Sequence, residues 1–139
     1  VLFRSRAVIG DNSLDNIKFF DRPFMAGSTF SNSFDDYYEF VPILKYDDLL
    51  NQTITPFDLI KCDIEGSEWE FINHYEELFK KCKFLLLEWH SWHTGGGGFP
   101  QIEKKLHDQG FLTYKTSQPS PAIGRNGEVG LSLFKNKCF

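Results

Sequence analysis

The sequence predicts one α/β domain whose sheet is mostly parallel and ends in an antiparallel hairpin. An apolar strand at 57–64 leads through a glycine turn directly into a helix, and a second apolar strand at 84–90 follows. Two final strands, at 111–116 and 129–135, are joined without a helix. Alternation of strands and helices is typical of parallel sheets, whereas a helix-free connection favours antiparallel pairing. The 139 residues, 41% of them hydrophobic, suffice for one compact core.

In the first third of the chain, the sequence predicts short strands, a loop and a short helix. Apolar runs stopped by polar turns indicate strands at 7–9 and 17–20. Residues 24–37, rich in Ser, Gly and Asp, indicate a loop. A proline within 39–44 restricts that run to an edge strand, because proline cannot donate to a sheet ladder. Residues 46–51 predict a short helix.

The middle of the chain has the clearest pattern. The strand at 57–64 is apolar enough to be covered on both faces of a sheet. Ser67 is predicted to cap a helix over 68–75, in which Glu68 is placed to stabilise the N-terminal end of the helix dipole. A further helix is expected over 100–109, because it begins with proline and is followed by glycine.

Composition excludes several classes of protein. The formal net charge of -4 offers no basic field for nucleic acid. The longest apolar run falls far short of the roughly 20 residues that cross a bilayer, so no membrane span is expected. The three cysteines are widely separated and lack CxxC spacing, which indicates a reducing, cytoplasmic compartment. Nothing in the sequence predicts an oligomeric state.

The start of the chain lacks the features of a domain boundary. Residues 1–6 lead without a cap, a turn or an initiator methionine into what resembles the middle of a domain. We therefore expect residues 1–139 to form a single partial domain, with 1–6 as a non-native leader.

Acidic and imidazole side chains follow both central strands. The first strand end carries Asp63, Glu65 and Glu68, and the second carries Glu88, His90 and, slightly beyond, His93. Ligands of open α/β sheets bind beyond the carboxyl ends of the strands, so the candidate catalytic residues are Asp63, Glu65, Glu88 and His90. If the strands are neighbours, the groups face one another across one crevice. His90 is the expected general base for an acceptor hydroxyl, since the unperturbed pKa of imidazole lies near neutrality.

A metal centre is the competing interpretation of the same residues. Glu88, His90 and His93 together suggest zinc, but a structural zinc site normally uses four ligands, so no metal site is predicted. Metal-dependent hydrolysis through the four candidate catalytic residues stays open as an alternative function. The glycine run at 95–98 lacks the phosphate-binding patterns and is expected to be a plain loop rather than a lid.

The run Asp58-Leu-Ile-Lys-Cys-Asp-Ile-Glu-Gly-Ser-Glu68 resembles the signature of FkbM-type methyltransferases, a hydrophobic strand followed by Lys-x-Asp-x-Glu-Gly-x-Glu. Residues 41–50, 87–90 and 109–111 resemble flanking segments of that family, and the resemblance extends over 7–135. It implies a Rossmann-like class I methyltransferase sheet, which ends in an antiparallel hairpin. It also implies S-adenosylmethionine as methyl donor and a sugar or another small hydroxylated molecule as acceptor.

The resemblance also implies roles for particular residues. Asp63 and Glu65 correspond to the active-site edge of the family's fourth strand, and Glu88 and His90 to its fifth. The residues implied in cofactor binding are Arg6, Ala7, Val8 and Asp63. The family's glycine-rich first turn and the acidic end of its second strand have no counterpart before residue 7, so the first strands are expected to be missing. A non-catalytic binding domain on a decayed methyltransferase scaffold is therefore a further alternative.

Overall fold

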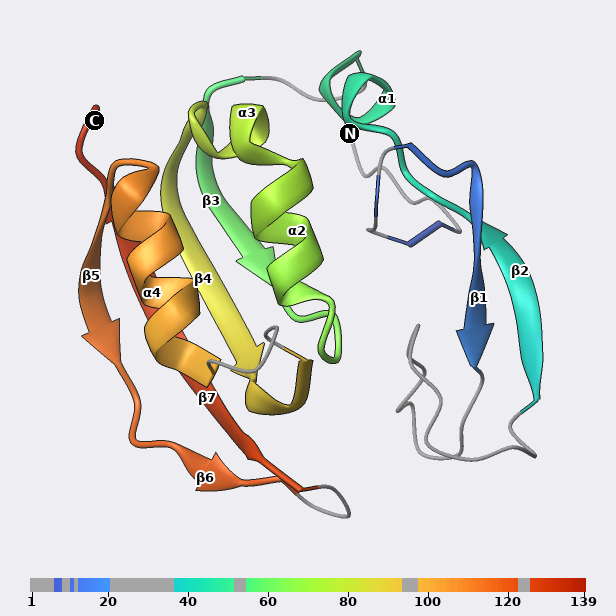
Figure 1. Cartoon of the computed structure of the whole chain (residues 1–139). Coiled ribbons are helices and arrows are strands. Elements are labelled where there is room, and N and C mark those ends of the chain that lie inside the picture. The colour runs from blue at the N-terminus through green and yellow to red at the C-terminus, as the bar shows by residue number, and fades with distance from the viewer. Residues whose placement is uncertain are drawn as a thin grey trace.

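The computed structural model describes residues 7–8, 11, 13–20, 37–51, 55–93, 98–122 and 126–139. Within them, the strands form two sheets, and the helices lie beside these sheets (Figure 1). The strands are β1 (Asn16–Phe20), β2 (Tyr38–Pro42), β3 (Phe57–Cys62), β4 (Cys82–His90), β5 (Phe111–Thr116), β6 (Ser120–Pro121) and β7 (Glu128–Asn136). The helices are α1 (Tyr46–Asn51), α2 (Glu68–His74), α3 (Glu76–Phe79) and α4 (Gly98–Asp108), with a 3₁₀ helix at Ser91–His93.

The larger sheet has the strand order β3-β4-β7-β5, and β6 pairs with β7. β3 and β4 are parallel, with Cys62 opposite Leu87, and the pairings of β4, β5 and β6 with β7 are antiparallel. The predicted antiparallel ending is confirmed. The expectation of a mostly parallel sheet is not met in the described residues, because β7 lies between β4 and β5 and pairs antiparallel with each of them.

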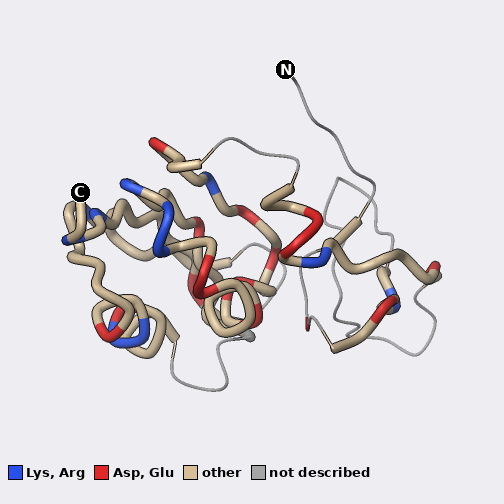
Figure 2. The backbone as a smooth tube through the Cα atoms, turned by 90° about the horizontal axis from the view of Figure 1, so that it is seen from above, with Lys and Arg blue, Asp and Glu red and all other residues tan. Residues whose placement is uncertain are grey.

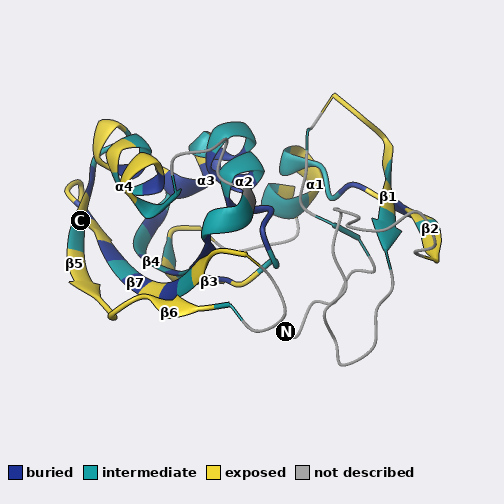
Figure 3. Ribbon diagram, turned by 60° about the horizontal axis from the view of Figure 1, so that its bottom comes forward, coloured by how far each residue is buried: buried dark blue, intermediate teal, exposed yellow. Residues whose placement is uncertain are grey.

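The helices cover one face of this sheet (Figure 3). Along β4, Leu85, Leu87 and Trp89 are buried, whereas the alternate residues up to Glu88 are half-buried. This alternation follows from the two-residue period of a strand. From the helices, α4 contributes Ile102 and Leu106 to the same core, one helical turn apart.

The exposed side chains of β3 correct one prediction. We expected this strand to be covered on both faces, but Leu59 is 52% exposed and the strand is buried mainly at its end, at Cys62. β3 forms an edge of the larger sheet as described, and its apolar residues Phe57 and Ile60 pack against the core.

The smaller sheet consists of β1 and β2, paired antiparallel. Of the strand predicted at 7–9, Val8 forms a single parallel bridge to Ile43. The edge strand and the short helix predicted from 39–51 are confirmed as β2 and α1. The loop predicted at 24–37 lies outside the described residues except for its last position.

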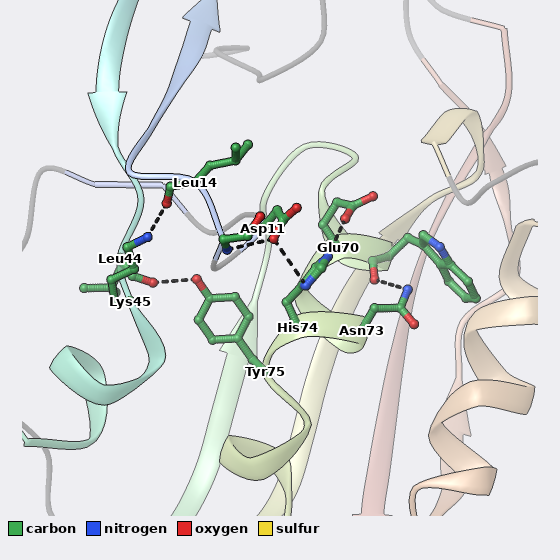
Figure 4. Close-up of polar contacts among 10 residues, drawn as sticks. Asp11, Leu14, Leu44, Lys45, Glu70, Asn73, His74 and Tyr75 are labelled. Atoms are coloured by element: carbon green, nitrogen blue, oxygen red, sulfur yellow. Dashed lines mark hydrogen bonds and ion pairs between the residues drawn. The ribbon is translucent and has the colours of Figure 1, made fainter.

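Polar contacts join the N-terminal segment to α2 (Figure 4). The Tyr75 hydroxyl donates to the carbonyl of Leu44, and Tyr75 itself is buried. His74, the last residue of α2, directly precedes Tyr75. Its Nε2 lies 3.1 Å from Glu70, and its Nδ1 lies 3.8 Å from Asp11. These contacts place the segment that carries Val8 near the C-terminal end of α2.

Candidate functional site

The site begins with the tight turn between β3 and α2. The Ser67 N–H donates to the carbonyl of Ile64 over 3.2 Å, and the two central residues have positive φ, 54° at Glu65 and 104° at Gly66. Such a turn requires left-handed backbone at both central positions, which glycine adopts freely and glutamate at a cost. The turn therefore reverses the chain directly after Asp63 and holds the Glu65 side chain at the end of the strand.

A buried acid–imidazole pair connects this turn to β4. Glu68 is fully buried, and its Oε1 accepts from the backbone N–H of Gly66 over 3.0 Å. The same oxygen lies 2.9 Å from Nδ1 of His90, which is 3% exposed. Because a carboxylate only accepts, Nδ1 carries the hydrogen and Nε2 is the nitrogen left for a ligand or a proton. The ring of His90 also packs against Trp92, with centroids 4.6 Å apart.

The carboxylates around His90 alter its pKa. Burial by itself lowers the pKa of the imidazole, because it disfavours the charged form. The hydrogen bond to Glu68 and its negative charge oppose burial, and the charges of Glu65 and Glu88 add to them. The net result is a pKa raised above the ordinary histidine value.

The structure brings three of the four predicted catalytic residues together. One ligand atom each from Asp63, Glu65 and His90 lies within 4.8 Å of the others, and we call this group the strand-end cluster. Glu88 stands two positions before His90 on the same strand and acts on it through its charge. The cluster forms because β3 and β4 are parallel neighbours, so that their carboxyl ends meet at one edge of the sheet.

Asp63 is the most accessible member of the strand-end cluster. Its side chain is 35% exposed, and its Oδ2 lies 3.1 Å from the Nζ of Lys61, which is itself 57% exposed. Lys61 stands two residues earlier on β3, so it approaches from the same side of the strand. Its ion pair engages one carboxylate oxygen and leaves Oδ1 for another partner.

The sequence left open whether Glu68 only stabilises the helix dipole or takes part in the site, and it predicted Ser67 as the helix cap. The Ser67 side chain makes no capping hydrogen bond within the described helix. Glu68 reaches back to the turn and across to β4. An acidic residue in the first turn of a helix, directly after a glycine turn, is the available signal, but no local pattern points to its partner 22 residues away.

Among the described residues, no hydrogen bond or ion pair joins Ala7 or Val8 to Asp63. Arg6 lies outside the described residues. Ala7 and Val8 are half-buried, and Val8 is linked through Ile43 and Leu44 to the C-terminal end of α2, whereas Asp63 precedes the N-terminal end of that helix. The assignment of Ala7 and Val8 to a cofactor site therefore stays a prediction.

Two other predicted features lie at the margin of the site. His93 ends the 3₁₀ helix after β4, and its side chain lies outside the described part. Of the glycine run at 95–98, Gly98 begins α4, and the residues before it are outside the described ranges. Neither feature adds a described side chain to the strand-end cluster.

An apolar cavity of about 220 Å³ lies beside β3, between α1 and the helices α2 and α3. Its lining includes Cys62 and Ile64, the neighbours of Asp63, and its one charged residue is Lys61. Because the lining offers neither a carboxylate nor an imidazole, the groups able to move protons are those of the strand-end cluster.

The fold and the site together define an α/β domain with an acid–imidazole centre at the carboxyl ends of two parallel strands. The model of the methyltransferase FkbM domain matches residues 5–113, which include the whole strand-end cluster and both of its strands. The chain therefore belongs to the FkbM methyltransferase family, and the resemblance of residues 58–68 to that family is confirmed. Comparisons with curated proteins and with solved structures gave no match.

Membrane and charge properties add two findings. Every helix in the described part of the chain is too short or too polar to cross a bilayer. Lys and Arg are interspersed with Asp and Glu along the described backbone (Figure 2). The exclusion of nucleic acid and the cytoplasmic location stay predictions from the sequence.

Proposed function

We propose that this protein transfers a methyl group from S-adenosylmethionine to a hydroxyl oxygen of a sugar or another small hydroxylated acceptor. The observation that carries the proposal is the strand-end cluster, in which a buried carboxylate orients an imidazole beside two further carboxylates, in a chain of the FkbM methyltransferase family. Such a centre serves oxygen methylation, because an alcohol is a weak nucleophile until its proton is removed.

The described residues fit the charge of the cofactor. S-adenosylmethionine supplies, when bound, an electrophilic methyl group on a positively charged sulfur. Asp63 and Glu65 present carboxylates at the open end of β3, where negative charge favours a cation and accepts hydrogen bonds from hydroxyl groups. Asp63 is the described residue best placed to hold the cofactor, because its side chain is partly exposed and follows the strand directly.

The cluster binds the acceptor hydroxyl and removes its proton. Glu68 holds Nδ1 of His90, so the ring cannot rotate away, and Nε2 has no hydrogen-bond partner among the described residues. Carboxylate oxygens of Glu65 and Asp63 lie within 4.8 Å of a ring nitrogen of His90, so a hydroxyl bound at the imidazole would lie near them. Placement of these groups supplies both proximity and a proton acceptor, and general-base catalysis of this kind contributes about 10²–10⁴ in rate.

Methyl transfer from labelled S-adenosylmethionine to a panel of small polyols and sugars tests the proposal. We expect Asp63→Asn and His90→Gln to lower turnover by about 10²-fold or more, while circular dichroism shows a retained fold. His107→Gln is the matched control, because His107 is exposed and bonds to Thr113 on the far strand of the sheet.

Two results would contradict the proposal. Turnover of Asp63→Asn and His90→Gln equal to that of the unaltered protein would remove the cluster from catalysis. Failure of the protein to bind S-adenosylmethionine in calorimetry, together with the lack of methyl transfer to any acceptor, would favour the non-catalytic binding domain.

A further inference from the structure

We infer that the strand-end cluster, formed by Asp63, Glu65 and His90, binds one divalent cation. Their ligand atoms lie within 4.8 Å of one another. Ligand atoms that share a cation at about 2.1 Å lie about 3 Å apart at right angles and about 4.2 Å apart across it. Ligand atoms that all lie within 4.8 Å of one another can therefore reach the spacing of a filled site through small side-chain rotations.

The buried imidazole distinguishes this cluster from a group of surface acids. His90 is 3% exposed, and its Nε2 has no hydrogen-bond partner among the described residues. One of its ring nitrogens lies within 4.8 Å of carboxylate oxygens of Asp63 and Glu65. Its Nδ1 is occupied by Glu68. A histidine that ligates a metal almost always donates its other ring N–H to a carboxylate or a carbonyl, which fixes the ring toward the metal.

Glu68 provides an independent indication that this site favours a positive charge. The side chain is fully buried, and its Oε2 has no hydrogen-bond partner in the described part of the chain. A buried carboxylate with an unsatisfied oxygen is costly, and the two neighbouring carboxylates of the cluster add to the negative potential. A divalent cation bound to Nε2 of His90 would offset this negative potential, because only the imidazole ring would separate it from Glu68.

The ligand set selects the cation. Two carboxylates favour Mg²⁺, Ca²⁺ and Mn²⁺, whereas imidazole favours the transition metals, so that Mn²⁺ meets both preferences. Lys61 already holds Oδ2 of Asp63 and leaves Oδ1 for the cation. Three protein ligands leave coordination positions open, as in catalytic rather than structural metal sites.

The role of the cation rests on the proposed function. An acceptor hydroxyl that binds at an open position loses its proton more readily, because a cation lowers the pKa of the oxygen it binds. The O–H bond breaks and the proton passes to water. The oxygen then forms the bond to the methyl carbon as the C–S bond of S-adenosylmethionine breaks, with its electron pair remaining on sulfur. His90 would then be a ligand in place of the general base predicted from the sequence.

Titration of the purified protein with Mn²⁺, followed by loss of the free-ion electron paramagnetic resonance signal, tests the cation site directly. We expect one saturable site per chain. Asp63→Asn should weaken Mn²⁺ binding by more than about tenfold. Even the mutation of a residue that only hydrogen-bonds to a metal ligand typically lowers metal affinity by about 10–100-fold. Asp58→Asn is the matched control, because Asp58 is an exposed acid on the same strand, paired with Lys83 away from the cluster.

The variant Glu68→Gln distinguishes Mn²⁺ binding at the strand-end cluster from nonspecific binding to acidic side chains. It removes no ligand, but it weakens the hold on His90, so we expect binding about 10–100-fold weaker. Circular dichroism establishes that each variant is folded. Absence of saturable Mn²⁺ binding in the unaltered protein, or equal affinity in Asp63→Asn and Asp58→Asn, would overturn the inference.

The two proposals fail in different ways. Mn²⁺ binding that depends on Asp63, without methyl transfer to any acceptor, supports the cation site and removes the proposed function. Methyl transfer that persists in a chelator, with no Mn²⁺ binding, supports the function and removes the cation site, and His90 then keeps its role as general base.

Discussion

Nδ1 of His90 lies 2.9 Å from Oε1 of Glu68, and both side chains are buried. The pair joins the first turn of α2 to the last residue of β4, so it connects the two segments that carry the strand-end cluster. Because the same oxygen of Glu68 also accepts from the Gly66 N–H, the turn, the helix and the strand are held by one carboxylate.

This pair makes stability depend on pH. The pKa of His90 is raised in the folded protein, whereas in the unfolded chain it lies near 6.5. The folded state therefore binds the proton more tightly. The resulting stabilisation is complete below the unfolded pKa and is lost as the pH rises through the raised folded pKa.

Urea unfolding from about pH 6 to about pH 9, in a chelator, measures this loss. We expect the free energy of unfolding to fall with rising pH across the raised pKa of His90. In Glu68→Gln, which keeps the shape but removes the charge, this fall should be smaller. The same pH dependence in both proteins would mean that Glu68 does not raise the pKa of His90.

Lys61 is predicted to compete with the inferred cation for Asp63. Its Nζ lies 3.1 Å from Oδ2, and both side chains are partly exposed. Removal of this positive charge in Lys61→Ala should strengthen Mn²⁺ binding by about two- to fivefold, the equivalent of one exposed ion pair. Lys83→Ala, which removes a lysine paired with Asp58, should leave the affinity unchanged. Weaker binding in Lys61→Ala than in Lys83→Ala would count against the cation site.

Gly130 is predicted to be intolerant of a side chain. A Cβ at this position would lie 2.3 Å from Cζ2 of Trp89, which is 1% exposed and donates from Nε1 to Ser132. Gly130→Ala should therefore lower the free energy of unfolding by about 1–3 kcal/mol, as overpacking does. Denaturant titration measures the loss. In the double variant with Trp89→Phe, the cost should be less than the sum of the single costs, and simple additivity would show that the two positions do not clash.

The three cysteines are predicted to differ in reactivity. Cys62 and Cys82 are buried, whereas Cys138 is exposed. Burial raises the pKa of Cys62 well above its usual value, and the negative charges of Glu68 and Asp63 raise it further. The thiolate is the reactive form, so a thiol reagent should modify Cys138 quickly and the other two only on unfolding. Mass spectrometry counts the adducts, and rapid labelling of folded Cys138→Ser would contradict the burial of Cys62 and Cys82.

The sequence predicted the elements whose signals are local. The strand, the glycine turn and the helix around Gly66 are predicted by an apolar run, a turn residue and a helix-start pattern within one short segment. The antiparallel ending is predicted by a connection that contains no helix. The position of Asp63 at a strand end was equally readable, since an acidic residue closes an apolar run. The prediction of a mostly parallel sheet does not hold for the described residues, because no local sequence pattern indicates that β7 lies between β4 and β5.

The sequence by itself determined the family, the order of the central elements and the residue types at the two strand ends. Only the tertiary structure decided that Glu68 is buried against His90 and that Asp63 and Glu65 share one cluster with that imidazole. The physical reason is that secondary structure depends on neighbours along the chain, whereas a site depends on the pairing of strands, here the parallel register of β3 with β4. That register brings residues 22 positions apart within hydrogen-bonding distance.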